Sequence, residues 1–331
     1  MVGPHPEIVV RAPDGIGEIE AGCDLAAVLV EALVRAYGDD ALRDGDVLVV
    51  TSKVVSKAEG RVVEGDREAW VDAETVRPVA RRGPTRIVRN RLGLIMAAAG
   101  VDASNVAAGS AVLLPLDPDA SARALRARVH ELAGVTVGVV VTDTAGRAWR
   151  EGQTDIAIGA AGLEVLSSFA GRLDAHGNEL AVTAPAVADE IASAVELAQG
   201  KLGARPCGIL RGRADLVLPL EDDGPGAGAL IRPEGGDLFG WGAREAVVRA
   251  VAASPSDLAP FGAPVPAEDL VDALGRAGLG AARRLDADAD ADVLVVDDAR
   301  ADAVRAVAFA HGWTCEDAAG GSGIRLRRAT T

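Results

Sequence analysis

The sequence has few cysteines, and they follow no pairing pattern. Its three cysteines, Cys23, Cys207 and Cys315, are odd in number, lie far apart and form no CxxC pair. Structural zinc sites need closely spaced cysteines, and disulfide frameworks need an even number of them. We therefore expect neither, and we interpret each cysteine as a small core residue in a protein of a reducing compartment.

Long uncharged apolar runs are also missing, as is an opening leader of positive charge followed by an apolar segment. Because a membrane-spanning helix needs about twenty apolar residues, we expect no membrane partner, no secretion and a cytoplasmic protein.

Basic residues are scarce too: 34 Lys and Arg face 49 Asp and Glu, a formal net charge of −15. That charge argues against nucleic acid as a partner, and an anionic ligand would need a metal ion or a local basic pocket.

Several common catalytic signatures are absent. The chain contains no GxxxxGK[ST], no HExxH and no GxSxG, and its alternating glycines at 224, 226 and 228 lack the strand-to-helix context of a dinucleotide-binding fingerprint. What remains is a set of Asp, Thr, Ser, Lys and Asn residues at predicted strand ends. Such a set suits oxygen-loving cations and phosphate better than nucleophilic catalysis.

The 331 residues, 49% hydrophobic and 25% charged, predict a globular chain of two domains. Apolar runs and helical spacing predict a mixed α/β fold, with a first domain at residues 1–243 and a small α/β appendage at 244–331. The first domain is expected to hold strands at 8–11, 47–50, from 137 and at 207–210, and helices at 24–37, 117–132 and 186–197. The appendage is expected to hold helices at 244–254, 267–277 and 299–311, strands at 293–296 and 324–327, and an Asp-Ala tract at 286–292.

Residues 137–163 form the most informative stretch. They open as an apolar, mostly β-branched run, which predicts a strand buried on both faces. Asp143 and Thr144 stand at its carboxyl end, where open α/β sheets bind ligands, and Arg147 and Arg150 follow. This combination suits a metal-bound phosphate. Taken alone, however, a capping role for Asp143 is the favoured interpretation.

Two further segments carry similar chemistry. Residues 51–61 place Lys53 and Lys57 among three hydroxyls after a predicted strand; a phosphate cradle and a simply solvated pair are evenly balanced there. Asp102 and Asn105 follow a small-residue turn, where turn formation is the favoured interpretation. Residues 77–91 are strongly basic and would attract a polyanion if they lined a cleft.

Five motifs together resemble the coenzyme F420-0:L-glutamate ligase family. They are TSKVVSKAEGR at 51–61, AGVDASN at 99–105, TDTAGRAWREGQTDIAIGAAGL at 142–163, ADEIASAVELAQGK at 188–201 and DLFGWG at 237–242, and the likeness spans residues 7–245 in order. Members of that family use GTP and divalent metal to add γ-linked L-glutamate to the phospholactate side chain of a deazaflavin cofactor. The resemblance implies a two-part α/β ligase fold and an intertwined homodimer.

The resemblance also implies site residues. Asp102 and Asp143 would hold one metal ion, Mg²⁺ or Mn²⁺, while Thr144 and Gln199 would approach a second, with K⁺ as a further candidate cation. Asp143, Asp102 and Lys57 would form the catalytic set. The residues expected to contact GTP are Ile16, Gly17, Glu18, Ile19, Ser52, Lys57, Asn105, Gln199, Gly200 and Lys201.

These expectations lead to one hypothesis and two alternatives. The hypothesis is a GTP-hydrolysing acid–amino-acid ligase of coenzyme F420 biosynthesis, which joins successive γ-linked glutamates to F420-0 through an acyl phosphate. From charge alone, Arg147, Arg150 or the 77–91 stretch would hold the substrate's carboxylates and phosphodiester. The alternatives are a non-catalytic GTP- or deazaflavin-binding regulator and a glutamate ligase for another small acid. Residues 244–249 begin like the nitroreductase-like domain of longer members, so the appendage is a candidate truncated version of it.

Overall fold

The computed structural model describes residues 7–280, 282–284, 293–297, 299–317 and 323–329. The expected Asp-Ala tract at 286–292 lies outside these residues. By their internal packing the residues divide into two units: the first comprises 1–76 and 89–231, and the second 77–88 and 232–331. Each unit is described by itself, and the domain boundary after residue 243 stays a prediction.

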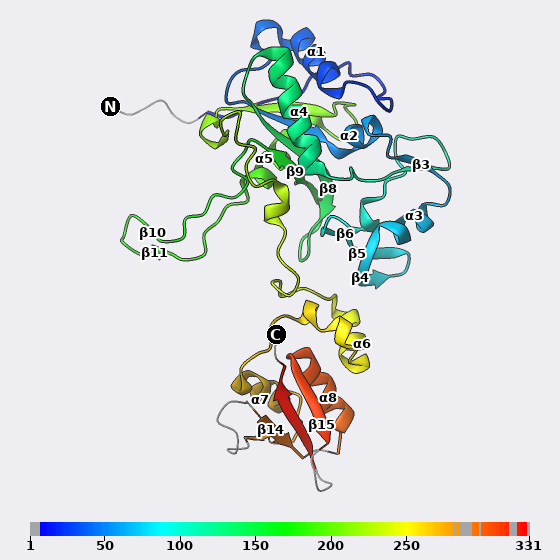
Figure 1. The fold of residues 1–331 in the computed structure, drawn as a ribbon, viewed down its shortest axis with the longest axis vertical. Coiled ribbons are helices and arrows are strands. Elements are labelled where there is room, and N and C mark those ends of the chain that lie inside the picture. The colour runs from blue at the N-terminus through cyan, green and yellow to red at the C-terminus, as the bar shows by residue number, and fades with distance from the viewer. Residues whose placement is uncertain (1–6, 281, 285–292, 298, 318–322, 330–331) are drawn as a thin grey trace. The chain divides into compact units, whose positions relative to one another are not determined.

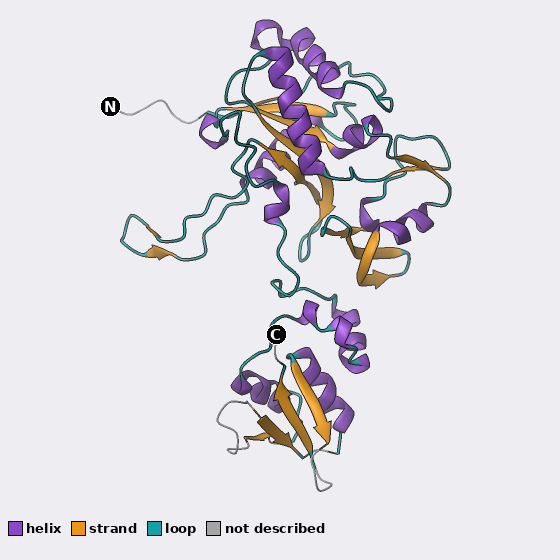
Figure 2. Ribbon diagram, viewed as in Figure 1, coloured by secondary structure: helices purple, strands orange, loops and turns teal. Residues whose placement is uncertain are grey.

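The first unit is built on a five-stranded sheet (Figures 1 and 2). In sheet order its strands are β1 (Val9–Arg11), β12 (Cys207–Arg211), β2 (Val47–Thr51), β8 (Gly138–Gly146) and β9 (Gln153–Ala161). β2 and β8 run parallel, and the other neighbours are antiparallel. The expected mixed α/β class is therefore confirmed.

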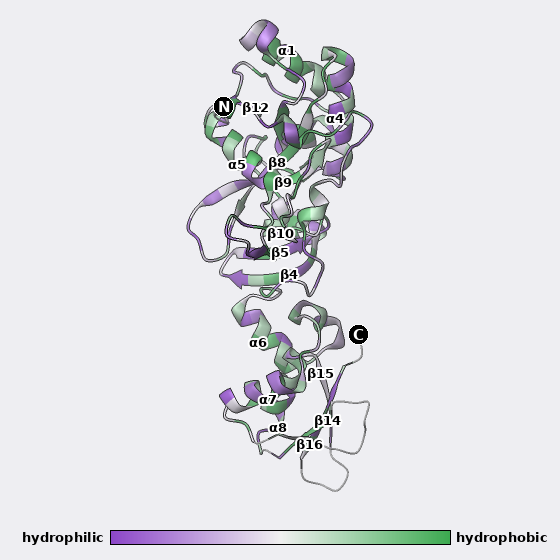
Figure 3. Cartoon of the chain, turned by 90° about the vertical axis from the view of Figure 1, so that its left-hand side faces the viewer, coloured by the Kyte–Doolittle hydropathy of each residue, from purple (hydrophilic) through white to green (hydrophobic). Residues whose placement is uncertain are grey.

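Helices cover both faces of this sheet. α1 (Leu25–Tyr37) and α4 (Pro118–Ala133) pack with Leu48 and Val50 of β2 on one face, and α5 (Val187–Gln199) packs with Val47 and Val49 on the other. Alternate residues of one strand thus enter two different cores, which explains the nearly unbroken apolar runs. Figure 3 shows hydrophobic residues along β8 and β9, in keeping with this double burial.

Local capping chemistry sets the ends of the predicted helices. Asp24 precedes α1 and accepts a hydrogen bond from the Ala27 backbone N–H at 3.1 Å. Asp117 caps α4 in the same way through Ala120, and Pro118 occupies the first turn, where its missing N–H costs nothing. These helices begin where the sequence placed them because side-chain oxygens satisfy their first free N–H groups.

The remaining elements before residue 232 are smaller, and two of them, β4 (Thr75–Arg82) and β5 (Thr85–Asn90), belong mostly to the second unit. The segment at 51–61, expected as a strand end, forms a short helix, α2 (Ser52–Ala58). The others are α3 (Arg67–Glu74), the pair β3 (Val62–Glu64) and β7 (Ser110–Val112), the neighbouring strands β4 and β5, β6 (Ile95–Ala97), and short 3₁₀ turns at Gly38–Asp40, Ala98–Gly100, Ala214–Leu216 and Ala227–Leu230. β10 (Arg172–Leu173) and β11 (Glu179–Leu180) form a hairpin that extends away from the sheet in Figure 1.

The second unit contains the expected appendage. Its antiparallel sheet has the order β13 (Ala282–Arg284), β14 (Val293–Val296), β16 (Ile324–Arg328) and β15 (Trp313–Asp317). α7 (Ala267–Arg276) and α8 (Ala301–Ala310) share a core with this sheet around Leu270 and Trp313. α6 (Ala243–Ala252) and 3₁₀ turns at Pro255–Asp257 and Ala259–Phe261 precede it. The predicted helices and the strands at 293–296 and 324–327 are confirmed, whereas β13 and β15 were not predicted.

Candidate functional site

Strand register brings the first two predicted site residues together. β2 and β8 are parallel, with Thr51 opposite Thr142, so the next residue of each chain segment lies at the same sheet edge. There the Ser52 hydroxyl donates to Asp143 Oδ1 at 3.2 Å, although 91 residues separate the two in the chain. The sequence predicted that this strand ends at Asp143. In the structure β8 continues to Gly146 and forms one arm of a hairpin with β9.

Helix α2 extends this contact to both predicted lysines. Lys53 Nζ lies 2.6 Å from Asp102 Oδ2 and donates to Ser104 Oγ at 2.7 Å. Lys57 is buried, forms an ion pair with Glu18 and donates to the Asn105 backbone carbonyl at 3.0 Å. Neither ammonium group is therefore simply solvated, whereas the phosphate cradle stays a prediction.

The charge state of the two aspartates reflects their surroundings. Burial, with smaller contributions from the negative charges of Asp155 and Asp102, raises the pKa of Asp143 to about 6, although the hydrogen bonds from Ser52 and the Thr144 backbone lower it. Burial also raises the pKa of Asp102, but the hydrogen bonds from Lys53 and Ser104 outweigh it, so that this pKa lies below its usual value. The cluster thus concentrates negative charge that a cation would relieve.

Asp155 is a member of the cluster that our interpretation of the sequence missed. It stands opposite Thr144 in the β8–β9 register and is buried. Its two carboxylate oxygens accept from the Thr142 hydroxyl at 3.0 Å and the Thr144 hydroxyl at 2.8 Å. The available signal was a charged residue directly before the apolar run of β9, because buried carboxylates are rare unless they are paired.

The end of α5 adds two more predicted residues. Lys201 Nζ donates to Thr144 Oγ1 at 3.4 Å, which places the loop after α5 beside β8. Gln199 is buried, and neither its side-chain oxygen nor its nitrogen has a hydrogen-bond partner among the described residues. A buried amide without partners is rare in folded proteins and marks a place where a ligand or ion can supply them.

Other predicted residues have fewer contacts with the Asp143 and Asp102 cluster. Of the segment at 16–19, Glu18 reaches the cluster through Lys57, and Ile19 is buried in the core beside α2. Arg147 and Arg150 are exposed, and neither forms an ion pair with any residue that the structure describes. Arg91 of the basic stretch is engaged in structure instead, because it contacts Glu74 at 2.7 Å and donates to nearby carbonyls.

The donor set fits a divalent cation that shares its ligands with a nucleotide. Among the described residues, no three His, Cys, Asp or Glu side chains form a complete metal cage. Mg²⁺ commonly binds through one or two carboxylates, with substrate phosphates and water completing its octahedron. In the predicted set, Asp102 and Asp143 would supply that number of carboxylates, and Thr144 and Gln199 would add neutral oxygens.

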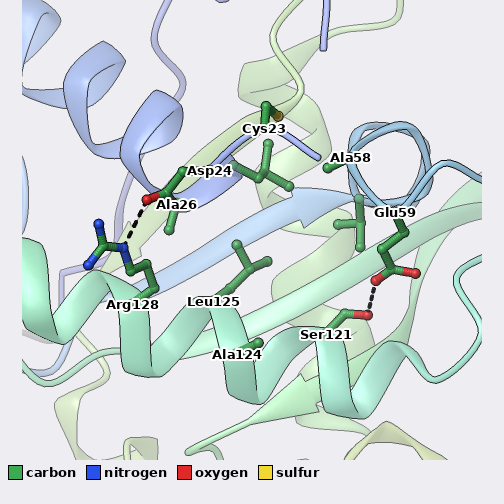
Figure 4. A pocket seen from close by; sticks show the side chains of 11 residues that line it. Cys23, Asp24, Ala26, Ala58, Glu59, Ser121, Ala124, Leu125 and Arg128 are labelled. Atoms are coloured by element: carbon green, nitrogen blue, oxygen red, sulfur yellow. Dashed lines mark hydrogen bonds and ion pairs between the residues drawn. The ribbon is translucent and has the colours of Figure 1, made fainter. Parts of the chain in front are cut away.

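A separate pocket of about 280 Å³ lies among α1, α2 and α4 (Figure 4). Its walls are mainly apolar, and two polar pairs border it: Asp24 with Arg128 at 2.9 Å, and Ser121 with Glu59. None of the predicted metal or GTP residues lines this pocket. We therefore place the candidate site at the sheet edge.

Across the described residues, no helix has the length and apolar character needed to cross a membrane.

Comparisons with known proteins find a matching family model and similar sequences. The family model described as F420-0:Gamma-glutamyl ligase matches residues 15–212. The chain is similar to proteins named coenzyme F420:L-glutamate ligase from Methanopyrus kandleri, 38% identical over 67% of this chain and 93% of that protein, and from Archaeoglobus fulgidus, 40% identical over 60% and 85%. The protein of that name from Methanothermobacter thermautotrophicus is 35% identical over 68% and 96%.

Proposed function

Because this chain belongs to the F420-0:gamma-glutamyl ligase family, whose similar members are named as ligases, we propose that it ligates L-glutamate to coenzyme F420-0. We propose GTP as the energy source, a divalent metal ion as its companion and successive γ-linked glutamates as the product. One observation carries the proposal. Through Ser52, Lys53 and Lys57, helix α2 contacts two segments that are far from it in sequence: Asp143 on β8, and residues 102–105.

The metal proposal rests on the oxygen donors at the edge. Asp143 and Asp102 would hold one ion, Mg²⁺ or Mn²⁺, and Thr144 and Gln199 would approach a second ion, with K⁺ as a further candidate. The Thr144 hydroxyl donates a hydrogen bond to Asp155 and accepts one from Lys201, so one lone pair of its oxygen remains available to a cation. A bound ion would neutralise phosphate charge as a Lewis acid.

The nucleotide proposal rests on the two lysines and their anchors. Lys57 is held by Glu18 and the Asn105 carbonyl, so its ammonium group is positioned rather than free to rotate in solvent. Ser52, the 16–19 segment, Gly200 and Lys201 would complete the contacts with GTP. Fixed cations next to phosphate oxygens lower the cost of the charge that builds up during phosphoryl transfer.

The proposed reaction has two steps. A carboxylate oxygen of the acceptor attacks the γ-phosphorus of GTP, which forms an acyl phosphate and releases GDP. The glutamate amine then attacks the acyl carbon, inorganic phosphate leaves, and the amine loses a proton as the amide forms. Positioning and charge neutralisation account for most catalysis of this type.

Mass spectrometry tests the proposal directly. Purified protein with F420-0, GTP, L-glutamate and Mg²⁺ or Mn²⁺ should yield products heavier by one or more glutamate residues. Asp143→Asn should lower turnover by at least about 100-fold, as expected when a charge-stabilising group is removed. Asp272→Asn, on an exposed ion pair of α7, is the matched control and should keep full activity. Folded wild-type protein that binds GTP but never extends F420-0 would refute the ligase proposal and favour a regulator.

Two wider proposals accompany this function. We propose a cytoplasmic homodimer, which sedimentation of the purified protein at several concentrations would test. We also propose that residues 244–331 are an appendage to a ligase domain at 1–243, with a truncated nitroreductase-like domain as its candidate origin. A shortened chain that ends at residue 243 and retains ligation would support that division.

A further inference from the structure

The tip of the β8–β9 hairpin, residues 147–152, presents a large aromatic side chain to solvent. Trp149 is 87% exposed, and its backbone lies in the left-handed region with φ of 64°. A bulky residue in that region is an outlier, because its Cβ crowds the neighbouring carbonyl. Exposing an indole costs free energy as well. Two unfavourable features at one residue suggest a role in binding rather than in stability.

The hairpin tip extends directly from the candidate site. Its two arms are β8, which carries Asp143 and Thr144, and β9, which carries Asp155. In the sheet order β9 lies on one side of β8, whereas β2, which leads into α2 and its lysines, lies on the other. The tip therefore extends from the flank of Asp143 opposite the predicted nucleotide contacts of α2.

Two further exposed apolar side chains lie in the last turn of α5 and just after it. Lys201 reaches Thr144, and its neighbour Leu202 is 98% exposed, while Leu197 at the end of α5 is 87% exposed. Large apolar side chains that gather at a site rimmed by polar residues are typical of surfaces that a ligand covers. The segment that reaches Thr144 through Lys201 thus carries apolar contact area outside the protein core.

The charge of the tip selects the kind of ligand. Arg147 and Arg150 flank Trp149 in a chain whose net charge is −15, and neither arginine is paired with another described residue. An indole face binds planar aromatic rings, and guanidinium groups bind phosphate and carboxylate in a two-pronged fashion. The combination fits a planar ring that carries an anionic side chain.

We propose that Trp149 stacks on the deazaflavin ring of the acceptor and that Arg147 and Arg150 bind its phosphodiester and carboxylate. This inference rests on the proposed ligase function, since it names the acceptor subsite of the same site. The tip then holds the acceptor so that its carboxylate reaches the sheet edge where Asp143 and Thr144 lie. Trp149 acts here as a binding residue and takes no part in bond making.

Equilibrium binding tests the inference without requiring turnover. F420-0 is titrated into the full-length protein without GTP or glutamate, and deazaflavin fluorescence anisotropy gives the Kd. Trp149→Ala should raise this Kd about tenfold or more, the range seen when aromatic stacking is removed, and Trp149→Phe should recover most of the affinity. Trp70→Phe, whose indole donates to the Glu64 carbonyl away from the tip, is the matched control and should leave the Kd unchanged.

A second probe separates the ring from the side chain. The neutral deazaflavin riboside, which lacks the phospholactyl group, should lose affinity in Trp149→Ala but keep it in the double variant Arg147→Met/Arg150→Met. F420-0 should lose affinity in both. In steady-state assays Trp149→Ala should raise the KM for F420-0 and leave the KM for GTP within about twofold, because only the aromatic contact is lost.

Several results would overturn the inference. An unchanged Kd for F420-0 in Trp149→Ala would do so, and so would a wild-type protein that binds neither probe. A shift of Trp149→Ala from dimer to monomer with an unchanged Kd would assign the indole to a subunit contact instead. Tight binding that depends on Trp149 in a protein that never ligates glutamate would support the acceptor subsite while refuting the ligase function.

Discussion

Arg126 provides a quantitative test of how the first unit holds its central sheet. Its side chain is only 1% exposed, yet its guanidinium group makes six hydrogen bonds. One reaches the Val137 carbonyl just before β8, and the others reach the segment at 218–223. The group also lies against the backbone of Gly162, where a Cβ would be 2.0 Å from the arginine Nε. Arg126 therefore ties α4, β8 and a distant loop together.

The expected loss of stability follows from what Arg126→Met leaves behind. Water can reach the carbonyls of Leu220 and Asp222, which belong to exposed residues, but Val137 is buried. Breaking a buried charged network by removing one member costs about 3–5 kcal/mol. We expect Arg126→Met to lower the free energy of unfolding of this unit by about 4 kcal/mol, roughly a thousandfold in the equilibrium constant.

Hydrogen exchange measures this loss in the relevant unit. The slowest amides of β2 and β8 report global opening of the unit, and mass spectrometry of their peptides gives its free energy. Arg126→Lys keeps the charge and three donors, so about 2 kcal/mol of loss is expected. Arg128→Met on the same helix removes an exposed pair with Asp24 and should cost about 0.5 kcal/mol. If Arg126→Met cost no more than this control, Arg126 would not hold these elements together.

Three further predictions concern the same unit. Burial raises the pKa of the Cys207 thiol to about 12, so at pH 8 a thiol reagent should titrate two thiols in the folded protein and three after denaturation. Hydrogen bonds from Arg11 and Arg211 lower the pKa of Asp40 to about 2, below its unfolded value of about 3.9. The ionised carboxylate therefore contributes its full stabilisation above about pH 4 and loses it as the pH falls towards 2. In urea titrations across that pH range, the Asp40→Asn variant should lose less stability than the wild-type protein does. A Cβ at Gly159 would lie 2.3 Å from the Pro118 carbonyl oxygen, so Gly159→Ala should lower the free energy of unfolding by about 1–3 kcal/mol, and an unchanged denaturation midpoint would contradict that packing.

Much of the architecture follows from local pattern. The helices at α1 and α4 begin at Asp24 and Asp117 because capping needs only residues a few positions apart. The buried strands can be predicted from their β-branched runs, because both faces of the sheet pack against apolar faces of helices. The segments around β3 and β4 lack such runs, since their residues are largely exposed, and they were not predicted. β7 is largely buried, and it was not predicted either.

The site divides along a similar line. The residue types of the site could be predicted from the sequence, because carboxylates, hydroxyls and lysines follow apolar runs at predicted strand ends. The resemblance of five motifs to the family then indicated which of these residues to expect in the site. The partners were not visible. That Ser52 meets Asp143 follows from the parallel register of β2 and β8, and that Asp155 accepts a hydrogen bond from the Thr144 hydroxyl follows from the β8–β9 register.

The physical reason is the range of the interactions involved. Helix periodicity and capping act over a few residues, so the order of amino acids encodes them directly. The pairings of Lys53 with Asp102 and of Lys57 with Glu18 join segments about 40 to 50 residues apart, and they exist only once the sheet has aligned those segments. Local sequence thus accounts for the elements and for the chemistry available at their ends. Folding of the whole unit then selects which of those groups face one another.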